Sequence, residues 1–158
     1  MIKNNKKGTG VIEILVIVAI LSVTLGGLLE LITFSLKTST IVRQISQADV
    51  LAQETMEEAR SFRDGTVWNT DGLGILTLDV SYYPVKSGSP LKWDLISGTE
   101  NVGIFQRQIV FSSVSRDENK DIVLSGGTID PDTKKATVIV SRPDGADIEL
   151  VTYFTNWR

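Results

Sequence analysis

The 158-residue sequence contains neither cysteine nor histidine. Without cysteine the chain has no disulfide bond and no thiol nucleophile, and without either residue it has no Cys/His zinc site. Catalytic arrangements of the Ser-His-Asp and Cys-His kinds are excluded for the same reason. The sequence also has no phosphate-binding loop and no nucleophile elbow. We therefore predict that the protein is not an enzyme.

Charge is missing from one long stretch near the N-terminus. No charged residue lies between Ile14 and Leu29, and extending the stretch to Leu36 adds only Glu30. Gly10 to Leu29 would span about 30 Å as a helix, the thickness of the hydrocarbon core of a bilayer. This run is longer than the apolar segment of a secretory signal peptide and lacks an A-x-A-like cleavage site. It predicts a single membrane-spanning helix.

A short basic segment, residues 1–8, precedes the apolar run. Its basic residues are Lys3, Lys6 and Lys7. Because lysines stay on the cytoplasmic side of a membrane helix, we expect the C-terminal bulk of the chain to lie outside the cytoplasm.

Glu13 is the unexpected residue of the apolar run, since a carboxylate inside a membrane is costly and usually has a partner. Its surroundings are Lys7-Gly8, Thr9-Gly10-Val11-Ile12 before it and the run from Ile14 to Ile20 after it. This pattern resembles the class III signal of type IV pilin-like proteins. The resemblance covers residues 6–36, about a fifth of the chain.

The resemblance implies how the chain would be processed. In that family a prepilin peptidase cuts after the glycine on the cytoplasmic face, the new N-terminus is methylated, and a glutamate stands fifth. Cleavage after Gly8 would make Thr9 the first residue and Glu13 the fifth. The sequence has Thr9 and Gly10 where the family usually has Phe or Met followed by Thr. It also has Glu30 where major pilins often carry a proline, which favours a minor pilin or pseudopilin.

The resemblance also implies a function and partners. The chain would be a structural subunit of a type IV pilus-like or type II secretion-like filament, with Glu13 pairing with the N-terminal amine of a neighbouring subunit. Its partners would be copies of itself or other pilin-like subunits, the prepilin peptidase, an inner-membrane assembly platform and, before assembly, the lipid bilayer. It would begin as a single-pass precursor in the cytoplasmic membrane and end in an extracytoplasmic or cell-surface filament. A DNA-uptake pseudopilus is a further filament system that the residues leave open.

Two other features bear on the partners. Removal of the three leader lysines from 16 basic residues leaves 13 against 19 acidic residues, a net charge of −6, so we expect no nucleic-acid partner. The competing hypothesis is a membrane-tethered extracytoplasmic binding domain or enzyme that uses a pilin-like anchor.

Beyond the membrane the helix is expected to continue through residues 37–64, since neither Gly nor Pro interrupts Leu28 to Asp64. An apolar stripe at helical period predicts packing on a C-terminal sheet; its members are Ile41, Ile45, Ala48, Ala52, Met56, Ala59 and Phe62. We place Glu58 among the polar residues between these positions. Gly26-Gly27 is either a point of bending on assembly or a close-packing surface for a neighbouring helix.

Residues 65–158 predict a globular sheet domain, which makes the chain an α+β protein with a pilin-like architecture. Alternation and turn residues predict five or six antiparallel strands. The expected strands are Leu76 to Tyr82, broken by Pro84, then Leu91 to Leu95, Ile104 to Ser115, Ile122 to Leu124, Ala136 to Val140, and Ile148 to Phe154. Asp130 to Lys135 is expected to be a polar turn. Trp68, Trp93 and Trp157 are expected in the core or against the helix.

One loop has a candidate metal-binding pattern. Asp117, Asn119 and Asp121 place oxygen side chains at alternate positions, as at the start of a calcium loop. Ile122 at the sixth position and Thr128 at the twelfth exclude an EF-hand. Some pseudopilins bind calcium in a sheet loop, so calcium is the one cofactor considered; the alternative is a solvated hairpin turn.

Overall fold

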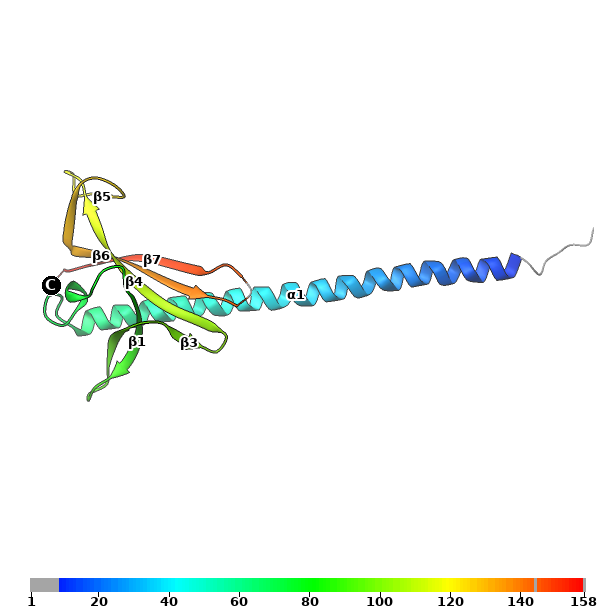
Figure 1. The fold of residues 1–158 in the computed structure, drawn as a ribbon, viewed down its shortest axis with the longest axis horizontal. Helices are drawn as coiled ribbons and strands as arrows, with labels where there is room; N and C mark the ends of the chain where they lie inside the picture. Colours follow the sequence, from blue (N-terminus) through cyan, green and yellow to red (C-terminus); the bar gives the residue numbers. More distant parts are fainter. Residues whose placement is uncertain (1–8, 144, 158) are drawn as a thin grey trace, which may run out of the picture. The chain divides into compact units, whose positions relative to one another are not determined.

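The structure is a computed structural model that describes residues 9–143 and 145–157. It is an α+β fold in which one long helix, α1 (Thr9–Gly65), precedes an antiparallel sheet (Figure 1). The contacts divide the chain into a unit that ends at Arg43 and a unit from Gln44 to Arg158. The basic leader and Gly8 lie outside the described residues.

The predicted helix is confirmed over its whole length. α1 runs through Gly26-Gly27 without interruption and ends at Gly65, directly after Asp64. Glycine is the residue that most often follows the last turn of a helix, because it adopts the conformations that close the helix without steric cost.

The sheet has seven strands, five of which follow the order β2-β1-β4-β6-β7. All pairings are antiparallel, and the short strands β3 and β5 both pair with β4. The strands are β1 (Ser81–Ser87), β2 (Lys92–Ser97), β3 (Glu100–Val102), β4 (Phe105–Arg116), β5 (Ile122–Val123), β6 (Thr128–Ser141) and β7 (Ile148–Thr155). One turn of 3-10 helix, η1 (Leu73–Ile75), precedes them.

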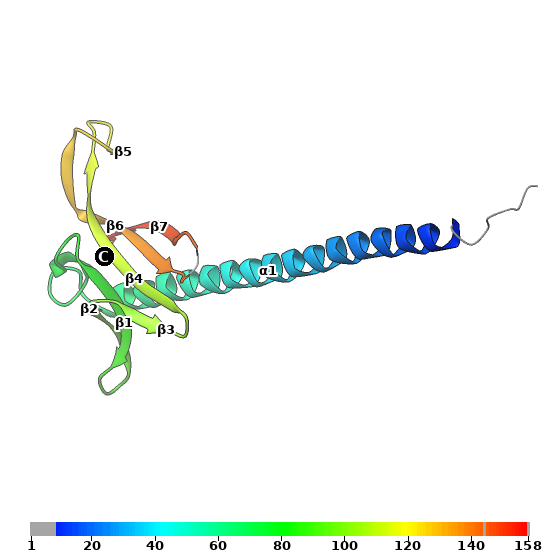
Figure 2. The same cartoon turned by 45° about the vertical axis from the view of Figure 1, so that its right-hand side comes forward.

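The core lies between the sheet and the part of α1 that follows Gln44 (Figures 1 and 2). The apolar stripe is buried from Ala48 to Phe62, which confirms its predicted role, whereas Ile41 remains 39% exposed. Three of the buried stripe residues are alanines, so the helix backbone can approach the sheet closely. The sheet residues that face them include Ile109, Phe111, Ala136, Val138, Val140 and Phe154.

The strand expected from Leu76 to Tyr82 is wrong except at its end. Leu76, Leu78 and Val80 do pack against the core, but they do so from an irregular segment. Asp79 has a φ of 59°, in the left-handed region, which breaks an extended run. The alternation of apolar and polar residues therefore reflects side chains that pack on the core from a segment that pairs with no strand. β1 begins only at Ser81.

Pro84 was expected to end this strand, and instead it lies buried inside β1 opposite Leu95. Proline is tolerated in a strand where its missing N–H is not needed for pairing. β1 pairs with β4 only at Ser81 and Tyr82, so the later part of that strand edge has no ladder to maintain.

The polar turn expected at Asp130 to Lys135 is also wrong, because these residues lie within β6. The pairing of β4 with β6 shifts register between Ser113 and Val114. Three residues of β6, Pro131 to Thr133, are left without a partner on β4 at that point. The turn-like composition thus marks a β-bulge inside a long strand.

Candidate functional site

The N-terminal half of α1 is an apolar surface that no other part of the described chain covers. All large apolar side chains between Val11 and Leu36 are 51% to 76% exposed. The best 18-residue window reaches a mean hydropathy of 2.6 and is 0% buried, so this is a helix long and apolar enough to span a membrane. An exposed apolar surface of this extent requires lipid or other helices around it.

Three hydroxyl groups on this surface form hydrogen bonds inside the helix. Ser22 donates to the carbonyl of Val18 at 2.8 Å, and Thr33 donates to the carbonyl of Glu30 at 2.8 Å. Thr24 makes a similar bond one turn back, to Leu21. In an apolar environment an unbonded hydroxyl costs several kcal/mol, roughly, so these bonds suit the helix to lipid or to a packed helical core.

Glu13 lies exposed in the first turns of α1 among side chains that are all apolar. Its neighbours Ile12, Ile14 and Ile17 are each more than half exposed. No ion pair or hydrogen bond joins the Glu13 side chain to any other described residue. Thr9 is the first described residue of the helix, and Gly8 lies outside the described residues.

Gly27 leaves a hollow on the side of the same helix half. Glu30, Leu31 and Phe34 line a groove of about 210 Å³ beside it. A Cβ at Gly26 or Gly27 would meet nothing within 4 Å among the described residues. Of the two predicted roles of this glycine pair, the hollow favours a packing surface for a neighbouring helix.

The helix and the sheet are joined by a buried ion network that the sequence analysis missed. Arg107 of β4 donates to Glu58 of α1 at 2.8 Å and to Glu100 of β3 at 2.7 Å. It also donates to the hydroxyl of Thr55 at 3.2 Å. We expected Glu58 on the polar side of the helix, and this expectation is wrong because its side chain is only 9% exposed. No local pattern marks Glu58, since its partners are about fifty residues away in sequence.

Burial governs the charge state of this network. Removal from water raises the pKa of the Glu58 carboxyl above its ordinary value of 4.5, while the guanidinium of Arg107 opposes the rise. Glu54 and Glu100 raise this pKa further by repulsion. Arg107 thus neutralises two carboxylates with one charge, and the pairing stays dependent on pH.

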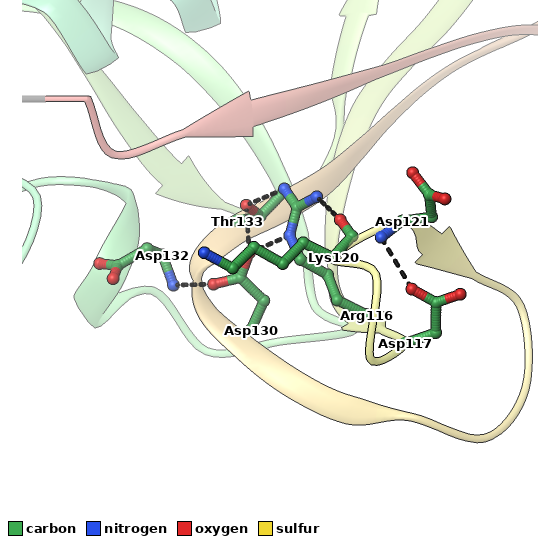
Figure 3. A network of polar contacts seen from close by, with 7 residues as sticks. All are labelled: Arg116, Asp117, Lys120, Asp121, Asp130, Asp132 and Thr133. Carbon is green, nitrogen blue, oxygen red and sulfur yellow. Dashed lines mark hydrogen bonds and ion pairs between the residues drawn. The ribbon is translucent and has the colours of Figure 1, made fainter.

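A second polar network lies where β4 and β6 extend toward β5 (Figure 3). Arg116 pairs with Asp130 at 2.6 Å and donates to the Thr133 hydroxyl at 3.1 Å. It also donates to the carbonyl of Lys120 at 2.7 Å. The hydrogen bond from Arg116, with another from Thr133, lowers the pKa of Asp130 below its ordinary value of 3.8.

The candidate calcium loop lies next to this network. One carboxylate oxygen of Asp117 accepts the backbone N–H groups of Asn119 and Asp121, each at 2.9 Å. Figure 3 shows the carboxylate of Asp121 directed away from that of Asp117. In the described ranges, no three His, Cys, Asp or Glu side chains are grouped as a metal site. Asp117 therefore supports the hairpin turn, and calcium binding at these residues stays a prediction.

The tryptophans divide into three environments. Trp68 is buried and its indole N–H has no acceptor among the described residues. Trp93 is partly buried beside the core, with the ammonium of Lys86 over its ring. Trp157 is 66% exposed and so lies outside the core, but it contacts the helix as the other expected alternative, since Arg63 at the end of α1 lies over its ring.

Trp68 and Trp157 line a cavity of about 230 Å³ at the C-terminal end of α1. Arg63 also lines it, but the guanidinium is already engaged with Asp64 at 2.7 Å and with the ring of Phe154. The charged group of the cavity is therefore used within the fold.

Comparison with protein-family models, with curated proteins and with solved structures finds no match to this chain.

Proposed function

We propose that the protein is a structural subunit, a minor pilin or pseudopilin, of a type IV pilus-like or type II secretion-like filament. The observation that carries this proposal is the exposed Glu13 on an otherwise apolar helix surface, five residues after Gly8. A carboxylate in that position would be unfavourable for a plain membrane anchor, and no residue in the described part of the chain pairs with it.

The proposed mechanism uses the charge that cleavage would create. Cutting after Gly8 would give Thr9 a positive primary α-amine, and methylation to a secondary amine would keep that charge at neutral pH. The amine of one subunit and Glu13 of the next would then neutralise each other inside a low-dielectric helical core. Because an unpaired buried charge costs several kcal/mol, roughly, only the register that pairs the two groups would be stable.

The rest of α1 supports the same function. Its apolar surface needs partners of the same kind once the protein leaves the bilayer, and the hollow at Gly27 offers a place for close helix packing. The second unit, Gln44–Arg158, is held to its part of α1 by the apolar stripe and Arg107. No observation of comparable weight supports the competing function, a tethered binding domain or enzyme. The guanidinium of Arg63, beside Trp68, is already paired with Asp64.

The test is the intact mass and N-terminal sequence of the protein isolated from its native membrane. We expect a chain that begins at N-methylated Thr9. A chain that still begins at Met1 while the peptidase is active on other substrates would overturn the proposal. Replacing Gly8 with valine should leave the precursor uncut, and normal processing of that variant would contradict the cleavage site.

A further inference from the structure

Two hairpins project from the sheet on opposite sides of the second unit (Figures 1 and 2). One, here called the β5 arm, comprises residues 114–130 and contains the end of β4, β5 and the start of β6. The other, the β1–β2 hairpin, comprises residues 81–97. Both lie on one rigid sheet, so the distance between them within one copy is fixed by strand pairing.

The β5 arm carries an exposed apolar side chain after β5 and an excess of acidic residues in the turn between β4 and β5. Leu124 is 99% exposed, and Ile129 nearby is 65% exposed. The turn of the arm carries three acidic residues, Asp117, Glu118 and Asp121, against one basic residue, Lys120.

The base of the arm is held in one conformation. Arg116 ties together Asp130 of β6, the Thr133 hydroxyl and the carbonyl of Lys120. Gly127 allows the return strand to pass close by, because a Cβ there would lie 2.4 Å from the carbonyl oxygen of Arg116. A surface that is already ordered loses less entropy on binding, which favours recognition by the arm.

The β1–β2 hairpin has the complementary chemistry. Lys86 and Lys92 flank its turn, and Leu91 between them is 71% exposed. Lys86 lies over the ring of Trp93, 4.6 Å from the ring centre, and within the described ranges neither lysine forms an ion pair. The hairpin therefore presents an apolar side chain with two positive charges near its turn and one negative charge, Asp94, further along β2.

We propose that the β5 arm of one copy contacts the β1–β2 hairpin of the next copy. The two surfaces differ and lie on opposite sides of the unit, so the contact is heterologous and repeats from copy to copy in one direction. Acidic and basic tips would attract each other, while arm-to-arm contact would be repelled by like charge. The inference rests on the proposed function, because it names the neighbour of a filament subunit.

The energetics assign the contact a limited role. Two hairpin tips bury much less than the roughly 1,200 Å² of a stable interface, so this contact would not hold copies together by itself. Exposed charge pairs add little affinity each. The apolar helix halves would supply the affinity, and the hairpins would fix which neighbour each copy meets and at what rotation.

Because the chain has no cysteine, introduced thiols are the only reactive ones. The experiment uses the full-length protein with both Leu124→Cys and Leu91→Cys, assembled and then oxidised. We expect a ladder of dimers, trimers and larger species, since each copy would link forward and backward. Each single variant should give no ladder. The matched control, Leu124→Cys with Ile104→Cys, places the second thiol at another exposed turn and should also give none.

Charge exchange gives a second readout. Lys86→Glu with Lys92→Glu should lower the yield of cross-linked dimer about two- to fivefold, and adding Glu118→Lys with Asp121→Lys should restore it. Restoration by opposite charges is not expected from a change in folding alone. Equal yields in all of these variants would contradict the charge pairing.

Sedimentation of wild-type assemblies separates this inference from the proposed function. If the wild-type chain sediments but the Leu124→Cys, Leu91→Cys variant gives no ladder, the hairpin contact is wrong and the filament proposal stands. Dimers from Leu124→Cys alone, or a cross-link to a different protein without a ladder, would also overturn it. If the wild-type chain does not assemble under conditions of active processing, the proposed function fails, and the hairpin contact fails with it.

Discussion

Arg107 of β4 donates to Glu58 of α1 across 2.8 Å, and both side chains are only 9% exposed. This pair adds a directional contact to the apolar packing of the helix on the sheet, in which Leu51, Met56 and Phe62 take part together with three alanines. Glu100 on β3 completes the network from the other side of Arg107. The network therefore ties one helix to two strands at a single buried point.

The first prediction concerns this network. Arg107→Met should destabilise the second unit by about 3 kcal/mol, because it leaves the buried Glu58 carboxylate without its partner. Chemical unfolding of the full-length protein in detergent, followed by tryptophan fluorescence, measures the change. Arg60→Met is the matched control, since Arg60 pairs with Glu57 on the exposed side of the same helix; it should cost less than about 1 kcal/mol. Equal losses in the two variants would contradict the buried network.

The second prediction follows from the raised pKa of Glu58. A carboxyl that binds its proton more tightly in the folded state disfavours folding once it is ionised. Below pH 4.5, the ordinary pKa, Glu58 is protonated in both the folded and the unfolded state and does not change stability. As the pH rises through the higher pKa of the folded state, ionisation of Glu58 lowers the free energy of unfolding. Loss of Arg107 removes the charge that opposes this rise, so the defect of Arg107→Met should be larger at pH 7 than near pH 4.5.

The free energy of unfolding of Arg107→Met, measured across this pH range, tests whether its stability defect grows toward neutral pH. Adding Glu58→Gln to that variant removes the titrating group, and the difference between neutral and acidic conditions should then shrink. A defect of Arg107→Met that grows toward acid would show that Glu58 is not the group responsible.

The helix and most strands were predictable because their signals are local. A charge-free run, an apolar stripe at helical period and the Asp64-Gly65 ending specify α1 without reference to the rest of the chain. Alternation over Ile104 to Ser115 likewise locates the central strand β4. Glu13 was identified in the same way, since its distance from Gly8 is a property of consecutive residues.

The predictions that are wrong concern residues whose conformation or burial depends on contacts with residues distant in sequence. Leu76 to Val80 alternates like a strand, but no neighbouring strand is available to pair with it. Asp130 to Lys135 has the composition of a turn, yet pairing with β4 on either side of the bulge keeps it in β6. Glu58 reads as a solvent-facing residue until Arg107 is placed opposite it. These outcomes depend on long-range pairing, which composition and periodicity do not contain.

The third prediction concerns the base of the β5 arm. Asp130→Asn should loosen the arm, because it removes the charge that pairs with Arg116 at 2.6 Å. Hydrogen exchange of residues 117–128 should become faster in this variant at neutral pH. Asp132→Asn is the matched control: it alters the neighbouring aspartate, which contacts Asn156 and makes no bond to the Arg116 side chain.

Acid should reproduce the effect of Asp130→Asn in the wild-type protein. The pKa of Asp130 is lowered in the folded state, so its contribution to stability is present above the unfolded value of 3.8 and is lost as the pH falls through the folded pKa. Protection of the arm should therefore fall below about pH 4 in the wild type. The difference between wild type and Asp130→Asn should disappear in the same range, and a difference that persists at low pH would contradict the assignment.

The last prediction concerns Glu13. Glu13→Ala should leave cleavage after Gly8 largely intact but strongly impair assembly, because the N-terminal amine of each neighbouring subunit would then be buried without a carboxylate. The matched control is Glu30→Ala, which removes the other carboxylate of the apolar helix half, at a position where no pairing with the N-terminus is proposed. Processing is read from intact mass, and assembly from the fraction of processed protein that sediments as filaments. Glu13→Asp should recover part of the assembly, since it keeps the charge but shortens its reach. If Glu13→Ala assembles as well as Glu30→Ala, charge pairing does not set the register of the filament, and the apolar surface alone must drive assembly.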